Sequence, residues 1–220
     1  MNSKTEFCRM QILVIAATLL EIKAFTEISP QTDILISGVG VPSSLYHLQE
    51  KLQQKPYDLV IQAGISGCFH EQYNGGSVVI AASDCFGDLG MEEKDVFTPI
   101  GDSVFSTPDL YPSPKGIIIN NHPLLQSLAY PLVKAVTVNK VTDDPNQSAL
   151  LQKTFSADIE SMEGAALHYC CWKKNIPYLQ LRAISNKVGD RNKKNWHIQL
   201  AVENLNKALL DIIKQFNPAH

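Results

Sequence analysis

Two glutamates stand in an unusual place in the segment DIESMEGAAL, residues 158–167. The small apolar residues 164–167 are typical of a helix face that packs closely against another element. Glu160 and Glu163 lie beside them, and a buried carboxylate without a partner is costly in free energy. One interpretation is a helix start, where acidic residues complement the helix dipole. The other is a carboxylate that binds a ligand, and this segment alone leaves both open.

Further polar residues follow predicted strands, and ligands of α/β sheets collect beyond the carboxyl ends of strands. Glu21 follows one apolar run, and Asn186 and Arg191 follow another. The glycine-rich turns SGVGVPSS (37–44) and AGISGCF (63–69) end two more. We therefore expect these groups to converge on one rim of the sheet. Each turn also has an ordinary explanation, because a tight connection at a strand end needs glycine anyway.

The spacing of apolar residues predicts alternating strands and helices. Strands are predicted at 11–18, 33–39, 58–64, 77–83, 115–120, 135–141 and 178–185. Helices are predicted at 19–27, 43–54, 122–130, 146–154, 160–174 and 194–216. Many of the strands are continuously apolar, which is typical of strands covered on both faces. This pattern predicts a three-layer α/β fold, with a central mixed, mostly parallel twisted sheet flanked by helices.

The segment 85–115 interrupts this alternation. It is rich in proline and glycine and shows no clear helix, and long irregular segments of this kind are usually functional or mobile. Strands of the same sheet are predicted on both sides of it, so it does not resemble a linker. We therefore expect a single domain over residues 1–220.

The composition argues against several classes of protein. A formal charge of −3 predicts no basic surface for nucleic acid. The apolar run near the N-terminus is too short to span a bilayer and lacks a small-residue cleavage site, so no membrane partner is expected. The five cysteines fit reduced thiols in a cytoplasmic protein. No metal-ligand spacing, nucleophile elbow or phosphate-binding loop is present in the sequence, so no metal or other cofactor is expected.

Four motifs occur in a recognisable order. ILVIAATLLEI lies near the N-terminus, AGISG follows the third strand, and SMEGAAL precedes RAISN. With this order and spacing the chain resembles the purine nucleoside phosphorylase and nucleosidase superfamily over residues 10–215. The resemblance implies cleavage of the N-glycosidic bond of a small-molecule nucleoside without a cofactor. It also implies a homodimer or larger homo-oligomer.

Three segments point to a narrower resemblance. VTVNKVT (136–142), GDLGMEEKDVF (87–97) and RAISNKVGDRNKKNW (182–196) are similar to the futalosine hydrolases. Those enzymes act in menaquinone biosynthesis and release hypoxanthine, and the resemblance implies the same reaction here. Methylthioadenosine/S-adenosylhomocysteine nucleosidases look similar at Glu21, but they typically carry aspartate where this chain has Asn186.

The resemblance implies roles for individual residues. Glu21 would activate the water that attacks the ribosyl C1′, and Glu163 would bind the ribose hydroxyls. Asn186 would hold the leaving base, since its amide can donate to O6 and accept from N7–H of a 6-oxopurine. Arg182 would position Glu163, and Glu160 is then an ordinary early-helix carboxylate. Further substrate contacts are implied for Met162, Gly64, Ile65, Ser66, Val141 and Thr142, and Arg191 is a candidate partner for a 5′ carboxylate or part of a solvated loop.

The absence of arginine from two segments bears on the nucleophile. Phosphorylases of this superfamily usually bind phosphate with arginines after the first strand and near the glycine-rich loop. AATLLEIK (16–23) and AGISGCFHEQ (63–72) contain none, and Glu21 would repel an anion. The sequence therefore favours water as the nucleophile. A methylthioadenosine/S-adenosylhomocysteine nucleosidase, a purine nucleoside phosphorylase and a non-catalytic nucleoside-binding protein are the alternatives.

Overall fold

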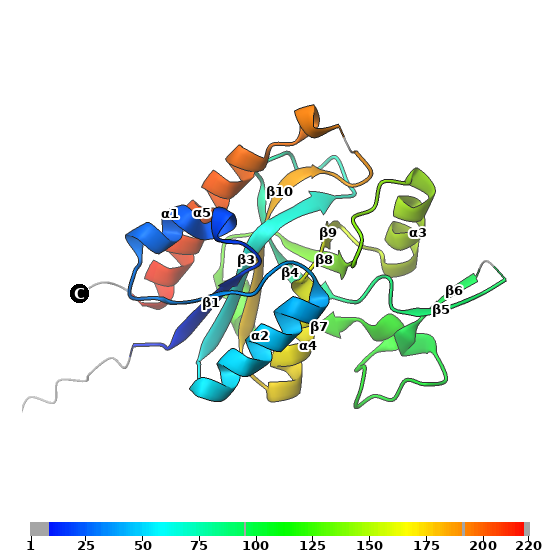
Figure 1. The fold of residues 1–220 in the computed structure, drawn as a ribbon, viewed down its shortest axis with the longest axis horizontal. Helices are drawn as coiled ribbons and strands as arrows, with labels where there is room; N and C mark the ends of the chain where they lie inside the picture. Colours follow the sequence, from blue (N-terminus) through cyan, green and yellow to red (C-terminus); the bar gives the residue numbers. More distant parts are fainter. Residues whose placement is uncertain (1–8, 95, 191, 218–220) are drawn as a thin grey trace, which may run out of the picture.

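A mixed eight-stranded sheet forms the centre of the computed structural model, which describes residues 9–94, 96–190 and 192–217 (Figure 1). Most of its strands are rich in Val, Ile and Leu and are buried on both faces, as predicted from their continuous apolar runs. The strands are β1 (Ile12–Ala16), β2 (Asp33–Ile36), β3 (Leu59–Cys68), β4 (Val78–Asp84), β7 (Ile118–Ile119), β8 (Leu132–Thr137), β9 (Ile159–Ser161) and β10 (Tyr178–Lys187).

The strand β3 organises the sheet because it pairs with three other strands. It runs parallel to β1 and β10, and its last residues, Gly67 and Cys68, pair antiparallel with β9. Since β10 pairs with β4, β4 with β8 and β8 with β9, these strands and β3 form a closed ring. Side chains from all five strands, among them Val79 and Ile159, pack into one buried cluster. The ring fixes the far end of β3 on both sides.

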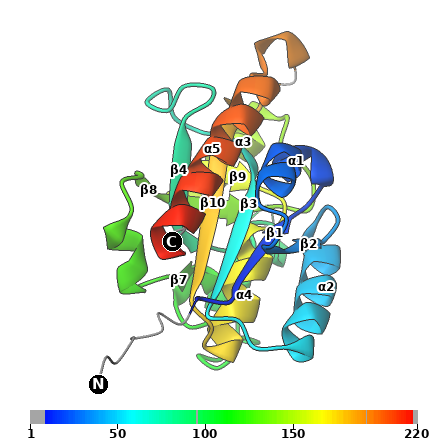
Figure 2. The same cartoon turned by 90° about the vertical axis from the view of Figure 1, so that its left-hand side faces the viewer.

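Helices cover two faces of the sheet (Figures 1 and 2). On one face α1 and α5 pack side by side and bury Phe25 and Leu209. On the other face α2 and α4 pack together and bury Leu48 and Leu167. A further helix, α3, packs against β8. The bounds are α1 (Leu19–Ile28), α2 (Val41–Gln54), α3 (Pro145–Phe155), α4 (Gly164–Lys174) and α5 (Ile198–Phe216).

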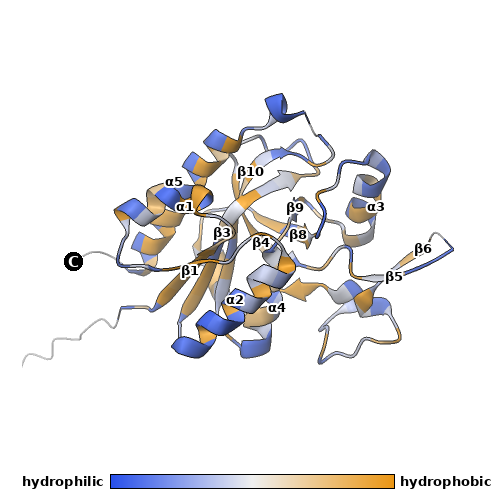
Figure 3. Cartoon of the chain, in the orientation of Figure 1, coloured by the Kyte–Doolittle hydropathy of each residue, from blue (hydrophilic) through white to orange (hydrophobic). Residues whose placement is uncertain are grey.

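Hydropathy follows these layers (Figure 3). The strands are mostly apolar, whereas the helices combine an apolar inner face with a polar outer face. None of the helices in residues 9–94, 96–190 and 192–217 has the length and apolar character that a membrane span requires. The three-layer α/β fold predicted from the sequence is confirmed.

One predicted helix is wrong in its first part. Residues 160–174 were expected to be helical throughout, but Ile159–Ser161 is the strand β9 and the helix begins at Gly164. All three strand residues pair with β8, and Ile159 and Glu160 pair with β3 on the other side. These long-range hydrogen bonds outweigh the local helical pattern.

The middle of the chain also differs from the predicted pattern. The segment 85–115 contains a two-stranded hairpin formed by β5 (Gly90–Glu93) and β6 (Val96–Pro99). The strand predicted at 115–120 is reduced to β7, and the helix predicted at 122–130 is a short 3₁₀ helix, Pro123–Ser127. Proline supplies no N–H for a regular helix or ladder, which explains the irregular backbone in this proline-rich part.

Candidate active site

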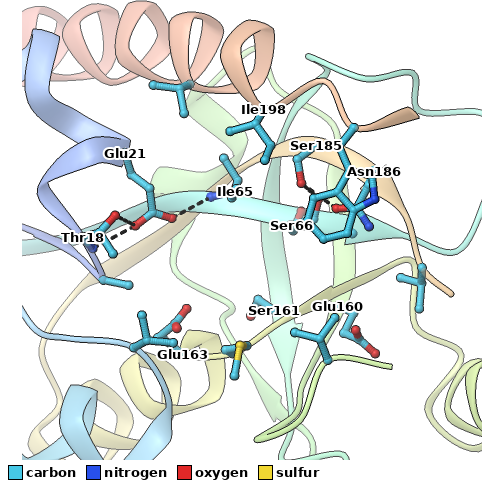
Figure 4. Close-up of a pocket in the computed structure, with 18 of the residues that line it drawn as sticks. Thr18, Glu21, Ile65, Ser66, Glu160, Ser161, Glu163, Ser185, Asn186 and Ile198 are labelled. Atoms are coloured by element: carbon cyan, nitrogen blue, oxygen red, sulfur yellow. Dashed lines mark hydrogen bonds between the residues drawn. The ribbon is translucent and has the colours of Figure 1, made fainter. Parts of the chain in front are cut away.

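A cavity of about 330 Å³ lies at the carboxyl ends of β1, β3 and β10 (Figure 4). Its volume is in the range of small-molecule binding sites. The structure brings eight of the predicted site residues to its wall: Glu21, Ile65, Ser66, Val141, Thr142, Met162, Glu163 and Asn186. These residues come from five separate stretches of the chain, so the fold assembles the cavity.

Glu21 is held at one end of the cavity by hydrogen bonds to its carboxylate (Figure 4). The backbone N–H and the hydroxyl of Thr18 donate to Oε2 at 3.0 and 3.1 Å. The backbone N–H of Ile65 donates to Oε1 at 3.2 Å. Thr18 is the N-cap of α1, and a glutamate three residues later commonly turns back to the N-cap N–H. The carboxylate is thereby oriented as an acceptor at the cavity wall.

Glu163 lies at the same end of the cavity as Glu21, on the segment between β9 and α4 (Figure 4). Its Oε1 accepts a hydrogen bond from the backbone N–H of Gly40 at 3.0 Å, and its Oε2 lies 3.8 Å from Nη1 of Arg182. Burial raises the pKa of the Glu163 carboxyl, whereas Arg182 and the Gly40 N–H act in the opposite direction. Gly40 has φ +88°, so the SGVG turn needs glycine to present this N–H.

Arg182 stands behind Glu163 and is not among the residues that line the cavity. It is 1% exposed, and its Nη2 donates to Oε1 of Gln62 at 2.6 Å. Gly64 makes room for it, because a Cβ at that position would lie 2.2 Å from Nη1 of Arg182 and 3.1 Å from Oε1 of Glu21. Gly64 therefore serves the close approach of these two side chains and is not itself part of the cavity wall.

Asn186 lies at the other end of the cavity from Glu21 (Figure 4). Its Oδ1 accepts a hydrogen bond from the hydroxyl of Ser185 at 2.7 Å, and its Nδ2 donates to the carbonyl of Lys187 at 2.9 Å. A primary amide has two acceptor lone pairs and two N–H donors. The bonds to Ser185 and Lys187 use one of each, so one acceptor and one donor remain for a ligand.

The wall between the two ends combines apolar and polar groups. Val141 and Met162 supply apolar surface. The buried hydroxyl of Ser66 has no hydrogen-bond partner among the described residues, and such a group calls for a ligand or a water. Arg191, the candidate partner of a 5′ carboxylate, lies outside the described residues.

The interpretation of Glu160 as an early-helix carboxylate is wrong. Glu160 belongs to β9, is 6% exposed and lines the cavity. Its Oε1 accepts a hydrogen bond from the backbone N–H of Thr142 at 3.2 Å, which ties the 138–142 segment to the cavity wall. A strand of three residues is too short to produce a periodic signal, so only the pairing with β3 and β8 reveals its place.

Sequence reasoning also missed wall residues that belong to the helix α5 and the loop before it. Trp196, Ile198 and Val202 line the cavity. They come after a predicted loop and in a predicted amphipathic helix, where nothing in their types suggests a ligand contact. In the described parts of the chain no cluster of His, Cys, Asp and Glu could hold a metal ion.

Asp84 is a fully buried carboxylate outside the cavity. Its Oδ1 accepts hydrogen bonds from the backbone N–H of Cys85 at 2.7 Å and from the hydroxyl of Thr137 at 3.0 Å. Burial raises its pKa to about 7, although Gln180, Thr137, Arg182 and the Cys85 N–H lower it. Burial likewise lowers the pKa of His168 to about 4.

The Asp84→Asn variant is expected to gain stability relative to the wild type as the pH rises. The raised pKa of Asp84 gives a stability contribution that is complete below the unfolded value of 3.8 and is lost as the pH rises through about 7. Asparagine keeps the acceptor for Thr137 and cannot ionise. The difference in Tm, variant minus wild type, should increase by several degrees between about pH 5 and about pH 8.

Thermal unfolding monitored by circular dichroism at both pH values measures this difference. The lowered pKa of His168 gives a stability contribution with the opposite pH dependence, which is lost as the pH falls from 6.5 through about 4. His168 is present in both proteins, so this contribution cancels in the difference in Tm. Asp109→Asn, at an exposed position, is the matched control and should show a difference that does not depend on pH. A pH-independent difference for Asp84→Asn as well would contradict the prediction.

Comparison with known proteins identifies relatives of this chain. Residues 31–214 match the family model of the phosphorylase superfamily. A futalosine hydrolase from Streptomyces coelicolor is 31% identical over 199 aligned residues, which cover 84% of this chain and 81% of that protein.

Two solved structures show the same fold. The 5′-methylthioadenosine/S-adenosylhomocysteine nucleosidase from Colwellia psychrerythraea, in complex with adenine, has a TM-score of 0.79 at 16% identity and covers 97% of this chain and 98% of that one. The futalosine hydrolase of Helicobacter pylori has a TM-score of 0.71 at 17% identity and covers 92% of this chain and 97% of that one. At these identities the structural likeness establishes the fold alone.

Proposed function

The chain belongs to the phosphorylase superfamily and is an N-glycosyl hydrolase of the nucleosidase type, and we propose that its substrate is futalosine. Water would cleave the N-glycosidic bond and release hypoxanthine and dehypoxanthine futalosine, a step of menaquinone biosynthesis. The observation that carries this proposal is the arrangement of the cavity, with Glu21 and Glu163 at one end and the amide of Asn186 at the other, where Glu160 also lies with its Oε1 bound by the Thr142 N–H.

The two glutamates suit the sugar end of a nucleoside. Hydrolysis of an N-glycosidic bond passes through a ribosyl group with oxocarbenium character, and a nearby carboxylate stabilises that positive charge. Glu163, buried and fixed by Gly40, would accept hydrogen bonds from the ribose hydroxyls. Glu21 takes a proton from water as the water oxygen bonds to C1′ and the C1′–N9 bond breaks.

Asn186 suits the base end. The electron pair of the broken bond moves to the purine, which must be stabilised as it leaves. The free N–H of the Asn186 amide can donate to O6, and the free lone pair of its oxygen can accept from N7–H. An asparagine has no dissociable proton, so the N7 proton comes from solvent. Once N7 is protonated, this pattern matches a 6-oxopurine such as hypoxanthine, because the N6 amino group of a 6-aminopurine would face the donating N–H of the amide.

The cavity also supports water as the nucleophile. Among the described residues that line it there is neither lysine nor arginine, whereas phosphate binding usually relies on such cations. Arg182 is engaged behind Glu163 and does not reach the wall. Phosphate beside Glu21 and Glu163 would meet two carboxylates.

Release of free base from a small panel of nucleosides tests the function. The protein is incubated with futalosine, inosine and methylthioadenosine, each with and without phosphate, and the bases are separated by chromatography. We expect hypoxanthine from futalosine at a rate that phosphate does not change. Preferred release of adenine from methylthioadenosine would refute the proposal, and a strict phosphate requirement would identify a phosphorylase.

The Asn186→Asp variant is expected to change the preference for the base. A protonated aspartic acid can supply a proton to N7 of a 6-aminopurine, and it lacks the N–H that binds O6. We expect kcat/KM for futalosine to fall by about 100-fold, in line with losing one well-placed hydrogen bond to the leaving group. Adenine release from methylthioadenosine should rise above the wild-type level.

Competition between futalosine and methylthioadenosine in one reaction measures this change directly. Asn139→Asp, which replaces an exposed amide outside the cavity, serves as the matched control. An unchanged ratio of hypoxanthine to adenine in Asn186→Asp would show that Asn186 does not select the base. The expected homo-oligomer stays a prediction, as does the role of Arg191.

A further inference from the structure

The helix α1 is interrupted directly after Glu21. Ile22 has φ −125° and ψ 15°, outside the helical range. In an uninterrupted helix the carbonyl of Glu21 would accept the N–H of Phe25 four residues later. A break at Ile22 means that the body of α1 does not by itself set the orientation of the turn that carries Glu21.

Asn206 of α5 binds both of these backbone groups. Its Oδ1 accepts from the Phe25 N–H at 2.8 Å, and its Nδ2 donates to the Glu21 carbonyl at 2.8 Å. The second N–H of the amide donates to the carbonyl of Val202 on its own helix at 2.7 Å. The residue is 3% exposed, so water offers little competition for these bonds. Both donors and one acceptor position of the amide are used, which leaves it a single orientation.

We propose that Asn206 is a positioning residue for Glu21, because its side-chain amide bridges the two backbone groups on either side of the interruption in α1. Its amide joins the first turn of α1 to the following turn and to α5, and so fixes the Glu21 carboxylate at the cavity. This inference rests on the proposed role of Glu21 as the base that activates water.

The helix α5 connects the turn that carries Glu21 with the wall of the cavity. Ile198 and Val202 of α5 line the cavity, and the Val202 carbonyl accepts from the Asn206 amide. The helix that supplies part of the wall therefore also holds the turn that bears Glu21. On the other side of the carboxylate, Ile65 of β3 fixes Oε1. Glu21 is thus held between α5 and β3, from its backbone and from its side chain.

The chemistry of the site requires an amide. Aspartate has almost the same shape and can still accept from Phe25, but it would turn a carboxylate oxygen toward the carbonyls of Glu21 and Val202. Alanine removes all three bonds without adding a charge. Asn206→Asp and Asn206→Ala therefore test the same contact, but only the aspartate adds a buried charge that could impair folding.

The test compares Asn206→Asp and Asn206→Ala with the matched control Asn204→Asp. Asn204 lies on the same helix, and its amide donates to the Gly76 carbonyl at 2.9 Å, away from Glu21. With rates expressed per folded molecule, we expect kcat of Asn206→Asp to fall by about 100-fold, as for a catalytic group displaced by roughly 1 Å. KM should stay within about threefold, because the cavity wall that binds substrate is retained. Asn206→Ala should show a smaller loss, and Asn204→Asp should keep the wild-type kcat.

A double variant separates positioning from a merely structural role. If Asn206 acts through Glu21, then Glu21→Gln combined with Asn206→Asp should be no slower than Glu21→Gln alone. Losses that multiply, or a wild-type kcat in Asn206→Asp per folded molecule, would overturn the proposal. A purely structural role would lower Tm and leave kcat of the folded fraction unchanged.

Hydrogen exchange keeps this inference distinct from the proposed function. Mass spectrometry of the peptide covering residues 17–28 should show faster exchange in Asn206→Asp than in Asn204→Asp. This measurement needs no substrate. If the wild type released no base from any nucleoside, the proposed function would fail, and the exchange rates would still decide whether Asn206 holds the turn. Equal exchange rates of this peptide in the two variants would overturn the proposal that Asn206 holds the turn.

Discussion

Replacing Glu21 with glutamine is expected to lower kcat for hypoxanthine release by about 1,000-fold, within the range that general-base catalysis contributes. The glutamine oxygen can still accept from the Thr18 N–H and hydroxyl, so the capped turn should stay in place although the bond from the Ile65 N–H is lost, but an amide cannot take a proton from water. KM should change little, because the group acts on the nucleophile rather than on binding. Steady-state assays with futalosine, with free base quantified by chromatography, give both constants.

Glu27→Gln is the matched control for this variant. Glu27 lies on the same helix at an exposed position and outside the cavity, so its replacement should leave kcat unchanged. A Glu21→Gln protein with full turnover would contradict the proposed base role. It would also remove the basis for assigning Asn206 a part in catalysis.

The Glu163→Gln variant should lose both activity and stability. The amide oxygen can still accept the Gly40 N–H, but the negative charge that we propose acts on the ribose is gone, and Arg182 is left as a buried cation without its Glu163 partner. Loss of the charge should lower kcat by about 100-fold or more. Breaking a buried ion pair typically destabilises a protein by about 3–5 kcal/mol, so Tm should fall as well. Kinetics and thermal unfolding measure the two effects separately.

A second substitution separates these two effects. In Glu163→Gln combined with Arg182→Met, the buried Arg182 cation is removed, so part of the lost stability should return while kcat stays low. Recovery of activity together with stability would show that Glu163 contributes only to folding. Unchanged stability in Glu163→Gln would show instead that the 3.8 Å contact with Arg182 contributes little.

Much of the fold could be predicted from the sequence because its strands are continuous apolar runs. The strands β1, β3, β4 and β10 and the long helix α5 all lie near their predicted positions. These elements are dominated by burial, which the residue types record directly. The antiparallel closure of β9 on β3 depends on partners distant in the sequence, and no local pattern contains it.

The candidate site likewise contains residues that the sequence could place and residues that it could not. Glu21 and Asn186 could be placed from the sequence because Glu21 comes soon after β1 and Asn186 lies at the end of β10, two strands that their apolar runs identify. Glu160 could not, since its place depends on the short strand β9. Asn206 was equally hidden, because an asparagine in an amphipathic helix gives no sign that it binds the backbone of another helix.

The closed ring of strands has a consequence for how the protein folds. Gly67 and Cys68 pair with Glu160 and Ile159, about 90 residues away along the chain. Contacts between residues so far apart in sequence form slowly. The strand β9 leads directly into Met162 and Glu163, so the end of the cavity that holds Glu21 and Glu163 is complete only when the ring has closed. During refolding, helical signal should therefore return before hydrolytic activity, and the delay between them reports the time needed to close the ring.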